Sequence, residues 1–215
     1  MRYRLVVFDW DGTIIDSPAA IVVCIQEAAR EMGLKVPGAE RASHVIGLGL
    51  ADSLKIAVPD LPDHRYPEFV ALYRKHFLAR EDSMPVFAGM KDLLAELKSK
   101  APLAIATGKS RRGLDRALDA TGLRPLFTAS RCADETHPKP HPAMLVELMA
   151  EFETERENTL MIGDTSHDLE MARAAGVDAV AVTYGAHPET GLRACSPRGC
   201  VSSVEELRTW LSKNG

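Results

Sequence analysis

Short apolar runs that end abruptly in polar residues constrain the fold of this chain most strongly. Four such runs, most of them bounded by Pro, Gly, Asp or Thr, are Leu5–Phe8, Leu103–Ala106, Thr159–Ile162 and Asp178–Val182. Brief, continuous apolar runs are typical of strands that a parallel sheet buries on both faces. Longer helical patterns separate them, and this alternation is typical of βαβ units. The sequence therefore predicts an α/β fold with a parallel sheet and helices on both faces.

The first predicted helix of this core precedes the second strand, and the others follow the second and later strands. They are expected near Gly89–Lys100, Ser110–Thr121, Pro142–Phe152, Ser166–Ala175 and Ser203–Ser212. With 215 residues, 46% of them hydrophobic, the chain is long enough to bury a full core.

The first two predicted strands are separated by about 90 residues, far more than a crossover connection needs. The intervening segment opens with Asp16-Ser17-Pro18, where a capping side chain precedes a proline at the first helical position. Apolar residues then recur at helical spacing up to Gly33, and a second helical pattern spans Phe69–Phe77. We expect a small inserted helical cap at residues 15–82, and a core formed by residues 1–14 and 83–215.

Charge and hydropathy exclude several classes of protein. The net charge is −4, with acidic and basic residues mixed along the chain, so no basic surface for nucleic acid is predicted. The first apolar run is too short for a signal peptide or a membrane span, which favours a cytoplasmic protein without a membrane partner. The four cysteines show no CxxC spacing and are expected to be free thiols: Cys24, Cys132, Cys195 and Cys200.

Polar residues follow three of the predicted strands directly. In an open α/β sheet the carboxyl ends of the strands form the ligand crevice, so these residues should meet there. Asp9 and Asp11 follow the first strand, and Gly12 permits a turn that would let both carboxylates face one site. A carboxylate can attack phosphorus and form an aspartyl-phosphate, which is the role we expect for Asp9. Asp11 would then act as the general acid and base.

A divalent cation is expected at the same site, because an aspartate and a phosphate dianion repel each other. Hard oxygen ligands suit Mg²⁺. Asp164, after the third strand, is the first candidate ligand beside Asp9 and Asp11. Asp168, one helical turn further on, is expected either to be a further ligand or to orient the waters of the ion.

Two more residues are expected to contact a phosphoryl group. Thr107 ends the second strand and offers a hydroxyl, and Lys139 lies among prolines and offers a compact positive charge. Lys109 is expected to be solvated or near the phosphate. The histidines beside the motifs, such as His167, show no ligand spacing and are expected to be polar surface.

These motifs carry a family resemblance. Asp9-x-Asp11-Gly12-Thr13, Thr107, Lys139 with Pro140, and Gly163-Asp164-x-x-x-Asp168 resemble, in order, the four motifs of the haloacid dehalogenase superfamily. The resemblance implies a Rossmann-like core and a helical cap like that of phosphoglycolate phosphatases and β-phosphoglucomutases. True dehalogenases lack an aspartate at the position of Asp11, and P-type ATPases carry threonine there, so the resemblance favours a phosphatase or phosphomutase.

The cap of such phosphatases contains a glycine-containing loop that selects the substrate. Gly47, Leu48 and Gly49 resemble that loop, although an ordinary turn between helices would look the same. The leading hypothesis is an Mg²⁺-dependent phosphatase for a small phosphorylated metabolite, with phosphoglycolate as the precedent. A phosphomutase, a pyrophosphatase and a binding module without activity are alternatives. The substrate and the oligomeric state stay open.

Overall fold

The computed structural model describes residues 2–215 and contains a six-stranded sheet in which all paired strands are parallel. The strand order is β3-β2-β1-β4-β5-β6. The chain begins in the middle of the sheet, extends it to one edge, and then returns to build the other half. The strands are β1 (Leu5–Phe8), β2 (Leu103–Thr107), β3 (Ala129–Cys132), β4 (Thr159–Gly163), β5 (Asp178–Val182) and β6 (Gly199–Val201).

The four strands expected from the sequence are confirmed, two with the expected bounds and two longer by one residue. β3 and β6 were not expected. Both are edge strands, and neither has the continuous burial of the inner strands. Cys200 lies in β6, and all four cysteines are free thiols as expected.

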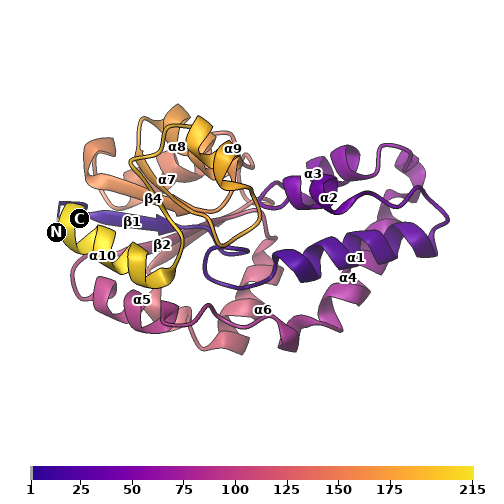
Figure 1. Cartoon of the computed structure of the whole chain (residues 1–215), viewed down its shortest axis with the longest axis horizontal. Coiled ribbons are helices and arrows are strands. Elements are labelled where there is room, and N and C mark those ends of the chain that lie inside the picture. The colour runs from indigo at the N-terminus through magenta and orange to yellow at the C-terminus, as the bar shows by residue number, and fades with distance from the viewer. Residues whose placement is uncertain (1) are drawn as a thin grey trace.

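Helices cover both faces of the sheet (Figure 1), which confirms the predicted α/β architecture. One face packs against α5 (Met90–Lys98), α6 (Arg111–Thr121) and α10 (Val204–Asn214), and the other against α7 (Ala143–Glu151), α8 (Ser166–Ala175) and α9 (Glu189–Ala194). All five helices predicted for the core are present, within a few residues of the expected bounds. α9, a short helix of low apolar content, was not predicted. Alternate residues of each strand enter the two cores, as the pleat requires.

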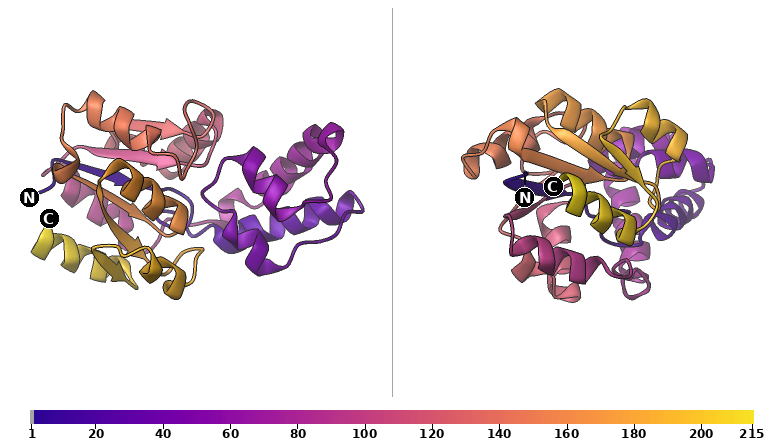
Figure 2. Two further views of the ribbon diagram at one scale, coloured as in Figure 1. Left: turned by 90° about the horizontal axis from the view of Figure 1, so that it is seen from above. Right: turned by 60° about the vertical axis from the view of Figure 1, so that its left-hand side comes forward.

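The cap helices, α1 to α4, stand together beyond the carboxyl ends of the strands (Figure 2). Their bounds are α1 (Pro18–Glu31), α2 (Ala39–His44), α3 (Leu50–Ala57) and α4 (Tyr66–Leu78). α1 and α4 pack along each other. Short 3₁₀ turns lie before and after α4, at Asp63–Arg65 and at Glu81–Ser83. This arrangement supports our proposal that residues 15–82 form a cap inserted into the core.

The two connections between the cap helices and the sheet run side by side. Ile15 and Val86 form an isolated antiparallel bridge. The amide of Asp16 donates to the carbonyl of Pro85 at 2.9 Å, and the amide of Phe87 donates to the carbonyl of Ile14 at 3.0 Å. The chain therefore leaves and re-enters the core at one place.

The start of α1 differs in one respect from the expectation. Ser17 is the N-cap residue and Pro18 is the first helical residue, but neither the Ser17 side chain nor another makes the capping hydrogen bond. The Ser17 hydroxyl donates instead to Asp11, at 2.8 Å. No helix within residues 2–215 combines the length and the apolar character needed to cross a bilayer.

Candidate active site

The turn after β1 brings the first motif against β4. Gly12 has a φ of +87°, a left-handed conformation that L side chains rarely adopt, and a Cβ there would lie 2.2 Å from Oδ2 of Asp164. The next residue, Thr13, donates its hydroxyl to Oδ1 of Asp164 at 2.7 Å. Position 12 of the predicted turn therefore requires a glycine, both because of its backbone conformation and because Asp164 occupies the space that a side chain would need.

Three buried carboxylates meet at the carboxyl ends of β1 and β4. One oxygen from each of Asp9, Asp164 and Asp168 lies within 4.8 Å of the others. Lys139 is also buried, and its Nζ lies 2.5 Å from Oδ1 of Asp9 and 2.6 Å from Oδ1 of Asp168. The structure thus brings together four residues that are as many as 159 positions apart in the chain, from Asp9 to Asp168.

Asp164 and Asp168 are held in place by neighbouring donors. Oδ2 of Asp164 accepts from the amide of Ala186 at 2.7 Å. Asp168 forms a capping box at the start of α8, where its Oδ2 accepts from the amide and the hydroxyl of Thr165 at 3.0 and 2.7 Å. The helix start therefore fixes the orientation of this carboxylate at the site.

Burial dominates the electrostatics of these groups. It raises the pKa of Asp9 to about 7, against the opposing effect of the Lys139 charge. It also raises the pKa of Asp164 well above its usual value, and the charges of Asp9 and Asp168 raise it further. Burial alone would lower the pKa of Lys139, but the two facing carboxylates outweigh it and raise that pKa. The site therefore gathers three carboxyl groups, whose charges are costly to bury together, around one ammonium group.

These residues fit a hard divalent cation. Oδ2 of Asp9 is buried and has no hydrogen-bond partner among the described residues. A buried carboxylate oxygen without a donor is costly, and a cation bound by the three carboxylates would satisfy it. Asp9, Asp164 and Asp168 are the residues that would hold Mg²⁺.

The side chain of Asp11 is turned elsewhere. Its carboxylate accepts from Nζ of Lys109 at 2.9 and 3.0 Å and from the Ser17 hydroxyl at 2.8 Å, and it is not part of the group of three carboxylates. Lys109 also lies over the ring of Phe77 on α4, 4.6 Å from its centroid. Asp11 thus lies between the core and the cap helices, and Lys109, expected to be solvated or near a phosphate, is its partner.

Thr107 ends β2 and is buried beside the site. Its hydroxyl oxygen accepts from the amide of Lys109 at 3.2 Å, which leaves the hydroxyl proton for another acceptor. It does not cap the next helix, because Ser110 is the N-cap residue of α6 and accepts from the amide of Gly113. This geometry leaves Thr107 free for the role expected of it, contact with a phosphoryl oxygen.

The cap loop expected from Gly47, Leu48 and Gly49 joins α2 to α3 and lies against the core. A Cβ on Gly49 would come within 3.2 Å of the Pro138 side chain, and one on Gly47 within 3.2 Å of the Thr165 hydroxyl. The loop is therefore both the turn between two helices and a cover over the loops that carry the third and fourth motifs.

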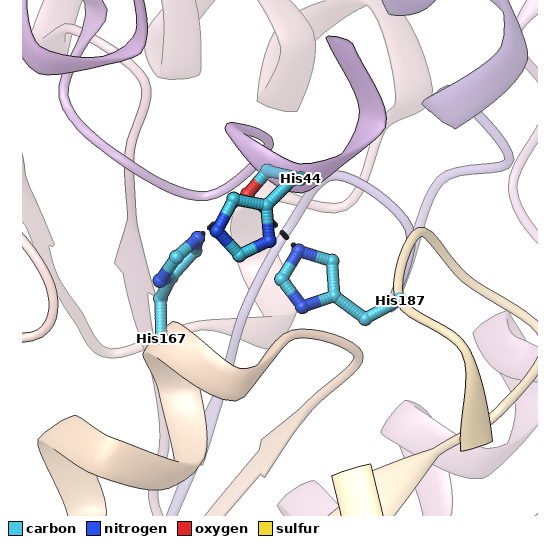
Figure 3. A group of neighbouring side chains, drawn as sticks. All are labelled: His44, His167 and His187. Atoms are coloured by element: carbon cyan, nitrogen blue, oxygen red, sulfur yellow. Dashed lines mark hydrogen bonds between the residues drawn. The ribbon is translucent and has the colours of Figure 1, made fainter. Parts of the chain in front are cut away.

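A second contact between cap helices and core involves three histidines (Figure 3). His167 and His187 direct their Nε2 atoms to the main-chain carbonyl of His44, at 2.7 and 3.1 Å. Nδ1 of His187 accepts from the amide of Ser166, so its Nε2 carries the proton. Burial lowers the pKa of His167, and lowers that of His187 to about 4, so both rings are neutral at pH 7. His167 is thus a buried contact residue and not the polar surface expected from the sequence.

Four residues that the sequence reasoning did not assign to the site are now seen to support it. Thr13 and Thr165 hold the carboxylates of Asp164 and Asp168, while Lys109 and Ser17 hold Asp11. Thr13 belongs to the first motif and Thr165 directly follows Asp164, and these positions were a usable signal. No comparable signal existed for the pairing of Lys109 with Asp11.

Comparison with known proteins agrees with this geometry. Residues 6–182 match the model of the haloacid dehalogenase-like hydrolase family. The chain is 36% identical to the "Probable phosphatase IndB" of Dickeya dadantii, over 94% of this chain and 91% of that protein. It is 30% identical to the pyrophosphatase PpaX of Halalkalibacterium halodurans, over 96% of each.

The fold is shared with solved structures as well. A crystal structure described as a predicted phosphoglycolate phosphatase from Haemophilus somnus superposes with a TM-score of 0.87 and 22% identity, covering 99% of this chain and 98% of that one. At that identity the likeness concerns the fold alone. Together with the matched family model and the ordered motifs, it leads to one conclusion: the chain belongs to the haloacid dehalogenase-like hydrolases.

Proposed function

We propose that this protein is an Mg²⁺-dependent phosphatase that hydrolyses a small phosphomonoester through an aspartyl-phosphate on Asp9. The observation that carries the proposal is the cluster of Asp9, Asp164 and Asp168, with a buried Asp9 oxygen that lacks a partner. The phosphatase name of the relative from Dickeya dadantii supports the reaction class.

Asp9 is the nucleophile in this proposal. Lys139 holds Oδ1 of Asp9 and so fixes the rotation of the carboxylate. One carboxylate oxygen attacks phosphorus, a bond forms between that oxygen and phosphorus, and the bond from phosphorus to the leaving oxygen breaks. Fixing the attacking atom in advance reduces the entropic part of the barrier.

Asp11 handles the protons. It donates a proton to the leaving alkoxide, and its carboxylate then removes a proton from the water that attacks the phosphoryl group on Asp9. The bond between phosphorus and Asp9 breaks, which releases inorganic phosphate and restores the Asp9 carboxylate. Because Asp11 contacts Ser17 and Lys109 in the structure, its side chain has to turn toward the substrate during the cycle.

The phosphoryl oxygens need positive charge and hydrogen-bond donors. Bound Mg²⁺ would supply charge that lets an anionic nucleophile approach an anionic phosphoryl group. Lys139 and the Thr107 hydroxyl add an ammonium group and a donor at the same end of the sheet.

Two other reactions use the same nucleophile. A pyrophosphatase is favoured by one specific observation, the 30% identity to PpaX of Halalkalibacterium halodurans. A phosphomutase would pass the phosphoryl group to a second hydroxyl in place of water. Accumulation of inorganic phosphate without a bisphosphate activator separates hydrolysis from the mutase reaction.

The test is Mg²⁺-dependent phosphate release from phosphoglycolate, sugar phosphates, nucleoside monophosphates and pyrophosphate. Asp9→Asn keeps the size of the side chain and removes the nucleophile, so we expect at least about a 1,000-fold loss of kcat. Thermal unfolding of the variant shows whether it is folded.

The outcomes separate the candidates. Fastest release from phosphoglycolate or another small ester supports the proposal, whereas fastest release from pyrophosphate supports the PpaX-like reaction. Equal activity in folded Asp9→Asn and in the wild type would contradict any mechanism that uses Asp9.

A further inference from the structure

The main chain of the cap loop rests directly on Gly108, the residue after Thr107. A Cβ on Gly108 would lie 2.5 Å from the carbonyl oxygens of both Gly47 and Leu48. These are main-chain atoms, so a side chain at position 108 cannot be accommodated by a change of rotamer in the loop. The absence of a side chain at Gly108 therefore sets how closely the cap loop approaches the core.

This contact adjoins residues of the proposed site. Thr107, immediately before Gly108, is buried, and so are Asp9 and Lys139. Asp11 is buried as well, although its ion pair reaches toward the cap helices. The structure therefore shows cap-loop main chain packed against the residue that follows β2, beside the buried groups of the proposed site.

Further contacts hold the loop in this position. The Ser43 hydroxyl donates to the carbonyl of Ala186 at 2.8 Å, and the His44 carbonyl accepts from His167 and His187. These hydrogen bonds fix the end of α2, directly before the loop. The closeness of the loop to Gly108 is thus one part of a docked interface.

We propose that Gly108 determines the size of substrate this enzyme accepts: it lets the cap loop close fully over a phosphomonoester with a small alcohol group, whereas a bulky alcohol group holds the loop away. This inference rests on the proposed phosphatase function. Full closure excludes water and aligns the reacting groups, so a small substrate gains rate from the contact and a bulky one does not.

The test is Gly108→Ala, assayed with phosphoglycolate as the small ester and adenosine monophosphate as the bulky one. The new methyl group holds the loop outward, so kcat/KM for phosphoglycolate should fall about 10- to 100-fold, the scale of a displacement of about 1 Å. The value for adenosine monophosphate should change much less. The matched control is Gly191→Ala in α9, where a Cβ meets nothing within 4 Å, and both values should stay as in the wild type.

A second measurement does not depend on activity. The amides of Ile46 and Leu48 donate within the loop, to the carbonyls of Ser43 and Val45. Their hydrogen–deuterium exchange should be faster in Gly108→Ala than in the wild type and in Gly191→Ala. Gly49→Ala, with its milder contact of 3.2 Å to Pro138, should shift exchange and selectivity in the same direction by less, and it serves if Gly108→Ala does not fold.

The results distinguish this inference from the proposed function. Unchanged exchange at Ile46 and Leu48, or an equal loss of activity on both esters, would overturn the role of Gly108. Absence of phosphate release from every substrate by the wild type would overturn the phosphatase, while the exchange data would still report on the contact.

Discussion

Lys139 is a fully buried ammonium group between two buried carboxylates, those of Asp9 and Asp168. Such a pairing is costly to desolvate, and its removal is costlier still, because it leaves carboxylates that face each other without a counter-charge. The stability of the site therefore depends on the same charge that the proposed reaction uses.

Lys139→Met should lower the free energy of unfolding by about 3–5 kcal/mol in the absence of divalent cations. Mg²⁺ should restore part of this loss, because the ion neutralises the same carboxylates. Urea unfolding with and without Mg²⁺ measures both effects. The matched control is Lys75→Met, which removes an exposed ion pair to Glu31 and should cost less than about 1 kcal/mol. Equal losses in the two variants would contradict the account given for Lys139.

For single residues, the sequence predicted which side chains meet at the site, but it did not predict the hydrogen-bond partners of all of them. Asp9, Thr107, Lys139 and Asp164 were expected at one edge of the sheet because each follows a strand or a recognisable motif. Asp11 was expected beside Asp9, but its carboxylate pairs with Lys109, 98 positions away. Rotation of one side chain decides between these partners, and no sequence pattern encodes it.

Among the elements, α6 begins at Arg111, soon after Gly108 and Lys109, so its start holds the segment that contacts the cap loop. Ser110 caps it, with the hydroxyl accepting from the amide of Gly113 at 3.3 Å. A side-chain acceptor at this position satisfies one of the free amides of a helix start.

Ser110→Ala should therefore destabilise the protein by about 1 kcal/mol, measured as a shift in the midpoint of urea unfolding. Ser212→Ala serves as the comparison, because that hydroxyl donates to the carbonyl of Thr209 within a helix and should contribute less than about 0.5 kcal/mol. If the two variants unfold alike, the Ser110 hydroxyl is not an effective cap.

Periodicity revealed the inner elements more reliably than those at the edges. The inner strands are buried on both faces, so most of their residues are apolar, whereas β3 includes Ser130 and Arg131 and β6 has only three residues. The six-residue α9 is too short for helical spacing to repeat. Pairing with a neighbouring strand, which no local pattern records, defines the two edge strands.

At the scale of the whole molecule, a cluster of ion pairs and a hydrogen bond surrounds Asp178, at the end of the sheet remote from the site. Its carboxylate accepts from Tyr3 at 3.0 Å and pairs with Arg2 and Arg198, which joins residues near both ends of the chain. The two termini lie near each other in Figures 1 and 2. Partial burial alone would raise the pKa of Asp178, but the hydrogen bonds from Arg198 and Tyr3 and the arginine charges bring it below its usual value.

A lowered pKa in the folded state means that this carboxylate stabilises the protein above the pKa it has when unfolded. That stabilisation is lost as the pH falls through the lower, folded pKa. Asp178→Asn should cost about 1 kcal/mol at pH 7, and the difference from the wild type should shrink below about pH 4. Unfolding by urea across pH 3–7 measures this, with Asp119→Asn, an exposed pair to Arg124, as the comparison. A difference independent of pH would show that packing, and not charge, is responsible.

The bridge between Ile15 and Val86 has a consequence for how this architecture can vary. Because both ends of the helical segment are fixed at one point, the entropic cost of bringing these ends together grows only with the logarithm of the length of the segment. A loop one third as long would change that free energy by only about 1 kcal/mol. The segment proposed to cover the substrate can thus be lengthened or shortened at little cost in chain entropy, while the strands that carry the carboxylates stay as they are.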